Sequence, residues 1–247
     1  MNASSTSASA EAALTRRVKQ LEDELETIRR ALSHDVRAPL ATVIGFAELL
    51  MQEKVGPLSP QQRGYLGDVF HSGQRALRFT DGLLCFSRLG RQPLQKETID
   101  TVVLISEVVR DVCRTEPGRD VAFRLSPLPE VRADRTLFRQ MFANLLANAW
   151  KFTRQTQNAV VEVEGSRHAG EVIIVVKDNG AGFDMKEAGR LFTPCERLHR
   201  EDHFEGIGMG LALAQRIAER HGGHITAEGV VGKGARFTVS LPQLPGD

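Results

Sequence analysis

Apolar residues recur along the first fifty residues in alternating steps of four and three, which is the spacing of a coiled-coil seam. The pattern predicts one helix of about 40 residues and about 60 Å, from about Glu11 to Met51. A helix with such a stripe gains most of its stability by burying it, so this helix needs partner helices. The seam consists of Leu14, Val18, Leu21, Leu25, Ile28, Leu32, Val36, Leu40, Val43, Ala47 and Leu50.

A histidine beside a carboxylate interrupts this seam, in the segment Ser33-His34-Asp35-Val36-Arg37-Ala38-Pro39-Leu40. Around His34 the seam takes successive steps of four, through Ile28, Leu32, Val36 and Leu40, a stutter that locally unwinds a supercoil. At about 100° per residue, His34 lies about 160° from both Leu32 and Val36, on the side away from the seam. Most surface histidines have no chemical role. A nucleophile that has to meet a partner protein would, however, also be placed in this way, on a rigid helix beside a carboxylate such as Asp35.

The composition limits the classes of function open to the chain. A formal net charge of +1 gives no support for general binding to nucleic acid or anionic membranes. No stretch approaches the roughly 20 apolar residues that span a bilayer, so no membrane insertion is expected. Cys85, Cys113 and Cys195 are far apart and lack paired metal spacing, which favours the reducing cytoplasm. Residues 1–10, rich in Ser and Ala, are expected to be disordered.

A second long helix is predicted after the break at Gly56-Pro57. The segment Ser59-Pro60-Gln61-Gln62 has the pattern of a capping box, and the helix should run to about Leu89-Gly90. Two long helices joined by a short loop form an antiparallel hairpin, which we expect over residues 11–90. One hairpin has two apolar stripes to bury, so two copies should pair as a homodimer with a four-helix bundle.

After a linker expected at residues 91–97, residues 98–247 carry a different pattern of short helices and strands. Their order predicts an α+β fold, a two-layer sandwich with one helical layer on a mixed sheet. The expected helices are Thr101–Arg114, a helix from an Asp134 cap to about Phe152, and Met209–His221; the expected strands are Val121–Leu125, Val160–Glu164, Glu171–Lys177, His224–Glu228 and Ala235–Leu241.

On the helix that begins at Asp134, three polar residues stand on one face at i, i+4 and i+7: Asn144, Asn148 and Lys151. Taken alone, they are most simply a solvated helix face. The functional alternative is a face for polyphosphate and metal. A carboxamide oxygen such as that of Asn148 suits Mg²⁺, and a lysine supplies a point charge to phosphate.

Two glycine-rich segments follow this helix. Asp178-Asn179-Gly180-Ala181-Gly182 could be a hairpin turn, but residues 183–192 show no alternation and so predict no partner strand. In the alternative, Asp178 accepts a hydrogen bond from the exocyclic amine of a purine, and the glycines allow close backbone approach. The glycines of the second segment, Gly206, Gly208 and Gly210, open into a helix whose free N–H groups can cradle phosphate.

These motifs together resemble the transmitter module of a HisKA-type sensor histidine kinase, of the kind attached to phytochrome- or PAS-type sensors. The resemblance covers residues from about 20 to 241, nearly the whole chain. Five segments carry it: Ser33–Leu40 resembles the H box, Asn144–Thr153 the N box, Asp178–Gly182 the first glycine box, Leu191–Cys195 the F box, and Gly206–Leu211 the second glycine box.

The resemblance implies a dimerisation and histidine-phosphotransfer hairpin followed by a Bergerat-type ATP-binding domain. It further implies that His34, oriented or deprotonated by Asp35, attacks the γ-phosphorus of Mg-ATP and later passes the phosphoryl group to an aspartate of a response-regulator receiver domain. Asn144, Asn148, Lys151, Asp178 and the glycines would hold the nucleotide, with Mg²⁺ on Asn148. The sensor domain that usually precedes such a hairpin is absent from this sequence, so we expect either a separate sensor protein or domain as a further partner, or that the sequence is a fragment of a longer protein.

Two rival functions deserve comparison. Chaperone and topoisomerase ATPases of the same nucleotide fold place a catalytic carboxylate near the N box, where this chain has Asn144, and an amide cannot act as a base. A dimeric phosphotransfer scaffold with an inactive ATP site is disfavoured by the intact Asn148 and Asp178.

A zinc site formed by Cys195, His199 and His203 lacks a fourth ligand with suitable spacing. Cys195 also stands where the F box usually has a second phenylalanine.

Overall fold

A computed structural model describes residues 37–52, 58–89, 93–116, 118–194, 196 and 208–243. The chain divides between Ser87 and Arg88 into two compact units, each of which is considered by itself. Several predictions fall outside the described residues: the first part of the long helix with His34 and Asp35, the tail of residues 1–10, Gly206, and the segment of Cys195, His199 and His203. No helix among the described ranges is both long enough and apolar enough to cross a lipid bilayer.

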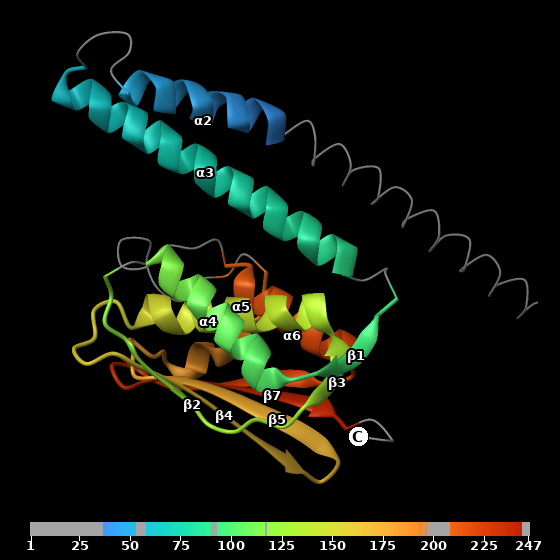
Figure 1. The fold of residues 1–247 in the computed structure, drawn as a ribbon. Helices are drawn as coiled ribbons and strands as arrows, with labels where there is room; N and C mark the ends of the chain where they lie inside the picture. The colour runs from blue at the N-terminus through green and yellow to red at the C-terminus, as the bar shows by residue number, and fades with distance from the viewer. Residues whose placement is uncertain are drawn as a thin grey trace, which may run out of the picture. The chain divides into compact units, whose positions relative to one another are not determined.

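The first unit contains the helices α2 (Arg37–Met51) and α3 (Pro60–Leu89), which form a hairpin (Figure 1). The predicted capping box at the start of α3 is confirmed. The Ser59 hydroxyl oxygen accepts a hydrogen bond from the backbone N–H of Gln62 at 3.2 Å, and the Gln62 side chain accepts one from the backbone N–H of Ser59 at 2.9 Å. These two bonds satisfy N–H groups that the first turn of a helix otherwise leaves unpaired.

The hairpin buries only part of its apolar surface within one chain. Ala47 and Leu84 are buried, and Gly73 approaches α2 so closely that an added Cβ would lie 2.6 Å from Cγ1 of Ile44. Other large apolar side chains stay exposed, among which Phe46 is 63% exposed. The hairpin therefore presents uncovered apolar surface of the kind that a helical partner buries. These exposed side chains are Val43, Phe46, Leu49, Tyr65, Val69 and Phe79.

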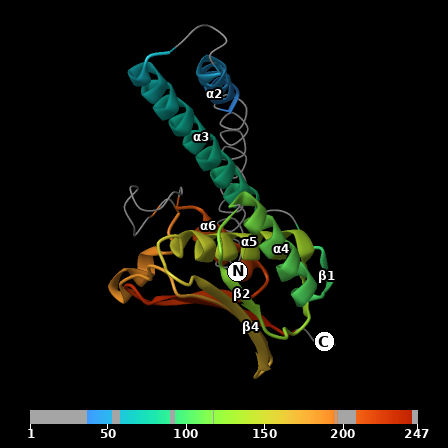
Figure 2. The same cartoon turned by 60° about the vertical axis from the view of Figure 1, so that its left-hand side comes forward.

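The second unit is a mixed five-stranded sheet covered on one face by three helices (Figures 1 and 2). The strand order is β2-β4-β5-β7-β6, in which β2 runs parallel to β4 and the other neighbours are antiparallel. The predicted two-layer α+β sandwich is confirmed. Its helices are α4 (Thr101–Thr115), α5 (Arg135–Phe152) and α6 (Gly210–Arg220), and its strands are β2 (Ala122–Leu125), β4 (Val160–His168), β5 (Glu171–Asp178), β6 (His224–Val230) and β7 (Gly234–Pro242).

The core lies between the sheet and the helices. Most apolar side chains of α5 are almost fully buried, because the helix packs against the sheet and against α4 and α6. β4 and β5 contribute the side chains that point to the helical face, in keeping with the period of two in a strand. The fully buried residues include Leu104, Ile105, Phe138, Met141, Phe142, Leu145, Leu146, Val161, Ile174, Val176, Ile217 and Val239.

Two short strands form a separate small sheet that the sequence patterns did not predict. β1 (Lys96–Ile99) pairs antiparallel with β3 (Val131–Asp134), so that Lys96 stands opposite Asp134 and Ile99 opposite Val131. Four residues are too few to show a clear alternation, and the two strands are far apart in the sequence. The pairing joins the segment that follows the hairpin directly to the start of α5.

Candidate functional site

The helix α5 carries three of the predicted site residues on the face that its apolar side chains leave free. The helix begins as predicted at the Asp134 cap, whose Oδ1 accepts a hydrogen bond from the backbone N–H of Leu137 at 3.1 Å. Asn144, Asn148 and Lys151 are each partly exposed. The ammonium group of Lys151 lies 4.2 Å from the centre of the Phe152 ring.

Asn144 lies against the beginning of α6. A Cβ atom added at Gly210 would sit 3.4 Å from Oδ1 of Asn144, so no side chain separates the two helices at this point. The Nδ2 atom of Asn144 is buried and has no hydrogen-bond partner among the described residues. An unsatisfied buried amide costs about 1–3 kcal/mol, so the arrangement suits a ligand that supplies an acceptor here. Phosphate oxygens are such acceptors, and the site therefore fits a polyphosphate.

The beginning of α6 offers further donors to the same place. Within the described part of the chain, no side chain caps the first turn of this helix, which starts at Gly210 after Gly208 at φ +71°. The unpaired N–H groups and the helix dipole together favour an anion at such an end.

Asp178, the last residue of β5, carries a buried carboxyl group. Its side chain is held by two backbone N–H groups, that of Gly180 at 2.9 Å from Oδ1 and that of Ala235. Burial outweighs these two bonds and raises the pKa of Asp178 from 3.8 to about 6. At neutral pH the group is therefore an ionised acceptor with little access to water, as recognition of an amine requires.

The segment after Asp178 is a loop and no hairpin turn, since the next element is the 3₁₀ helix η2 (Met185–Arg190). The loop is bound to two other parts of the unit. The backbone N–H of Ala181 donates to the carbonyl oxygen of Phe152 at 3.0 Å, and that of Gly232 donates to the carbonyl oxygen of Ala181 at 2.7 Å. At Gly182, with φ +60°, any Cβ would overlap the carbonyl oxygen of Val230.

Asn179 has a structural role that the sequence analysis missed. Its Oδ1 accepts a hydrogen bond from the backbone N–H of Val160 at 2.8 Å, and its Nδ2 donates to the carbonyl oxygen of Asn158 at 3.0 Å. These bonds tie the loop to the beginning of β4. No spacing in the sequence relates residues 158 and 179, so only the register between β4 and β5 shows this role.

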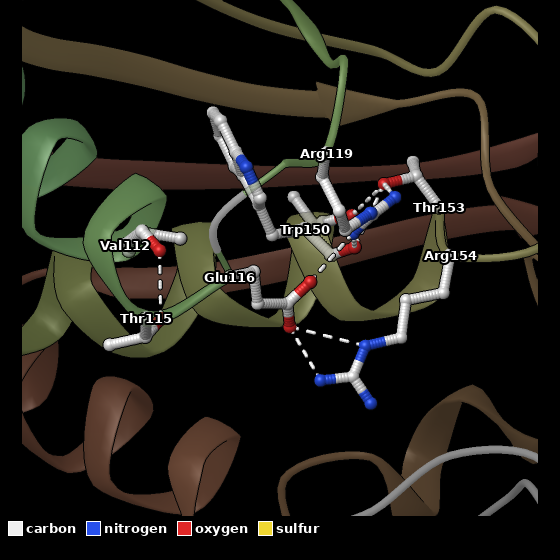
Figure 3. A network of polar contacts seen from close by, with 8 residues as sticks. Val112, Thr115, Glu116, Arg119, Trp150, Thr153 and Arg154 are labelled. Atoms are coloured by element: carbon white, nitrogen blue, oxygen red, sulfur yellow. Dashed lines mark hydrogen bonds and ion pairs between the residues drawn. The ribbon is translucent and has the colours of Figure 1, made fainter.

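A polar network fixes the last turn of α5, next to the loop (Figure 3). Arg119 donates to the carbonyl oxygen of Trp150 at 2.5 Å and to the hydroxyl oxygen of Thr153 at 3.4 Å. Glu116 bridges Arg119 at 3.0 Å and Arg154 at 2.5 Å. The hydrogen bond from Arg154, with that from Arg119, holds the pKa of Glu116 below its usual value.

The structure thus brings most of the predicted site residues into one unit and leaves others undescribed. Asp178, Gly180 and Gly182 are joined through Ala181 to the end of the helix that bears Asn144, Asn148 and Lys151, while Gly210, two residues after Gly208, lies beside Asn144. His34, Asp35 and Gly206 lie outside the described residues.

Fold and site together define a helical hairpin joined to an α/β sandwich with a polyphosphate-compatible face. Residues 24–92 match the model of the His Kinase A (phospho-acceptor) domain. Residues 133–245 match the model described as histidine kinase-, DNA gyrase B-, and HSP90-like ATPase. The chain is a transmitter module of the HisKA-type sensor histidine kinase family.

Similar proteins support this assignment. Over 86% of this chain, the sequence is 32% identical to the circadian input-output histidine kinase CikA of Synechococcus elongatus. Over 94% of this chain, it is 26% identical to the phytochrome-like protein Cph1 of Synechocystis. It covers only 29% and 31% of these two proteins. A crystal structure of full-length ShkA in complex with AMPPNP matches 87% of this chain and 45% of that one, with a TM-score of 0.66 and 30% identity.

Proposed function

We propose that this chain is a protein-histidine kinase that phosphorylates His34 from Mg-ATP and relays the phosphoryl group to an aspartate of a response-regulator receiver domain. The observation that carries the proposal is the buried amide of Asn144, which has no partner among the described residues and lies beside the start of α6, where none of these residues supplies a side-chain cap. A bound phosphate satisfies both groups at once. The ATP-binding family of the domain and the AMPPNP complex of ShkA support the choice of nucleotide.

Different residues of the site bind different parts of the nucleotide. The ionised Asp178 accepts a hydrogen bond from the exocyclic amine of adenine. Asn144, Lys151 and the segment with Gly206, Gly208 and Gly210 hold the phosphates. Mg²⁺, when bound through the carboxamide oxygen of Asn148, supplies positive charge to the phosphate oxygens.

In the first transfer, a ring nitrogen of His34 attacks the γ-phosphorus in line with the leaving ADP oxygen. The new N–P bond forms as the P–O bond to ADP breaks, and Asp35 orients the imidazole or accepts its second proton. Positioning and charge neutralisation supply most of the rate in such transfers. In the second transfer, the carboxylate of a receiver domain attacks the phosphorus, the N–P bond breaks, and the histidine is regenerated.

A homodimer is part of the proposal. The exposed apolar side chains of α2 and α3, such as Phe46 and Val69, form surface that a second hairpin buries in a four-helix bundle. The cytoplasmic location and a separate sensor protein or domain stay predictions.

The two rival functions make different demands on the site. A water-activating ATPase needs a base near the N box, and Asn144 offers only an amide. A scaffold with an inactive nucleotide site has no use for a buried carboxylate held by two backbone N–H groups, as at Asp178.

The test is transfer of label from ATP that is radioactive in its γ-phosphate. We expect acid-labile, base-stable label on the unmodified chain and none on His34→Gln, with nucleotide affinity within about threefold of the unmodified chain. The matched control is His71→Gln, which replaces an exposed histidine of α3 and should label normally. Residual acid-labile label on His34→Gln would remove His34 from the mechanism, and release of phosphate without any protein label would favour the ATPase.

A further inference from the structure

His221, directly after α6, uses both nitrogens of its ring inside the protein. The residue is 5% exposed. Its Nε2 accepts a hydrogen bond from the backbone N–H of Asp134 at 3.0 Å, and its Nδ1 lies 2.8 Å from the carbonyl oxygen of Ile217. Since Nε2 accepts, the ring proton is on Nδ1, which donates to Ile217. The ring is therefore neutral and connects the end of α6 to a residue on another element.

Asp134, the partner of His221, is a junction of three segments. Its Oδ1 caps α5 through the N–H of Leu137, and its Oδ2 accepts a hydrogen bond from the backbone N–H of Gln95 at 3.1 Å. Its backbone N–H is the group that donates to His221. The segment that follows the hairpin, the start of α5 and the end of α6 are thus held by the atoms of one residue.

The contact lies at one end of a helix pair whose other end is the proposed phosphate site. Asn144 follows Asp134 by about 15 Å along α5, and Gly210 precedes His221 by about 17 Å along α6, at 1.5 Å per residue. The two helices therefore run antiparallel, with one cross-link at His221 and the other close approach at Asn144. A fixed distance at the first contact limits the distance at the second.

We propose that His221 is a positioning residue for the nucleotide site, because its bond to Asp134 holds α6 at the separation from Asn144 that a polyphosphate requires. The inference rests on the proposed ATP site. The sequence motifs do not predict this role, since His221 lies outside the N box and outside both glycine-rich segments, residues 178–182 and 206–210.

The surroundings of His221 keep it in the accepting form. Burial is the main cause that lowers its pKa, and the positive charges of Lys96 on β1 and Arg220 on α6 act in the same direction, against Asp134 and the carbonyl oxygen of Ile217. Protonation would place a donor at Nε2 against the donor N–H of Asp134. The link is therefore present only with neutral histidine.

The test compares binding of Mg-ADP by calorimetry in the full chain at pH 7.5. His221→Leu removes the acceptor and should lose about tenfold in affinity, the scale of one buried hydrogen bond. His221→Gln keeps an acceptor and should stay within about threefold of the unmodified chain. His224→Leu, which changes an exposed histidine three residues further on, is the matched control and should bind normally. Equal affinities of His221→Leu and the unmodified chain would overturn the inference while leaving the proposed ATP site intact.

A second measurement needs no variant and covers the case in which His221→Leu does not fold. If the contact and the nucleotide site are coupled, the coupling is reciprocal, so Mg-ADP must strengthen the bond of the Asp134 amide. We expect hydrogen exchange at the Asp134 amide to slow on binding, beyond any change at the Val103 amide, which donates to the Asp100 side chain at the start of α4, away from His221. Equal changes at both amides would overturn the inference. Failure of the unmodified chain to bind Mg-ADP would instead reject the proposed function, and the inference with it.

Discussion

The backbone N–H of Ala181 donates to the carbonyl oxygen of Phe152 at 3.0 Å, which joins the loop after β5 to the last turn of α5. The bond links the candidate adenine-recognition residue Asp178 to the helix that carries the candidate phosphate ligands. Two residues earlier in the same turn of α5, the carbonyl oxygen of Trp150 accepts a hydrogen bond from Arg119. The two halves of the site are therefore parts of one rigid arrangement, and changes in the network should reach the nucleotide.

The choice of purine should depend on Asp178. Asp178→Asn replaces an ionised acceptor by an amide, which can donate to the O6 atom of guanine as well as accept from the amine of adenine. We expect the preference for ATP over GTP to fall by about tenfold or more, as measured by the two dissociation constants. Asp120→Asn, at an exposed aspartate, should keep the preference. Unchanged discrimination in Asp178→Asn would remove Asp178 from purine recognition.

The stability of the ligand-free chain should also depend on Asp178, with a predictable sign. Burial raises its folded-state pKa to about 6 from 3.8, so the folded state holds a proton that the unfolded state has lost. The stability from this group is fully present below about pH 3.8 and is lost as the pH rises through about 6. At pH 7.5, Asp178→Asn should therefore be more stable by up to about 3 kcal/mol.

Urea denaturation of both proteins between pH 4 and 8 checks this pH dependence. The histidines and other groups are present in both proteins, so the difference between the two curves isolates Asp178. We expect the difference to shrink as the pH falls below 6. A constant difference across this range would contradict a raised pKa.

The uncovered side chains of the hairpin should determine the oligomeric state. Val69 is 43% exposed in the single chain, and Val69→Asp would place an unpaired carboxylate inside the proposed bundle at a cost of several kcal/mol. Light scattering should then report a monomer. Asp68→Asn changes the exposed neighbour of Val69 and should leave a dimer. A dimer that persists after deletion of residues 11–90 would place the interface elsewhere.

The network at the end of α5 should stabilise the second unit. Arg119→Met removes the guanidinium donor of the Trp150 carbonyl oxygen, which then depends on the hydroxyl of Thr153, and it removes one of the two arginine partners of Glu116. We expect a loss of about 1–3 kcal/mol in the free energy of unfolding. Arg124→Met removes a pair with Glu162 in which the arginine side chain is 69% exposed, and should change stability by less than about 0.5 kcal/mol. Equal effects of the two variants in thermal unfolding would show that the network adds no more than a surface pair.

Local signals in the sequence were sufficient for most of the elements. The Ser59–Gln62 box and the Asp134 cap each lie within one turn of the helix that they begin, so their residues alone predict where α3 and α5 start. The first glycine segment was likewise recognisable as a loop, because no alternating strand follows Asp178.

The contacts that unite the site depend on the tertiary fold and leave no periodic trace. The bonds of Asn179 to the start of β4, of Arg119 to Trp150 and of His221 to Asp134 each join residues distant in sequence. The pairing of β1 with β3 was missed for the same reason. Spacing and residue type predicted candidate side chains for the chemistry, but not which residues hold those side chains in place.

The backbone of the loop after β5 passes very close to the backbone between β6 and β7, at Gly182 and at Gly234. This crossing of main chains restricts how the protein can evolve. A side chain at position 182 would collide with the carbonyl oxygen of Val230, and one at position 234 with that of Asp178. Both positions therefore reject every replacement of glycine on grounds of folding, before any selection on nucleotide use can act. Changes in nucleotide preference therefore have to arise at neighbouring side chains, such as that of the candidate residue Asp178, while Gly182 and Gly234 stay the same.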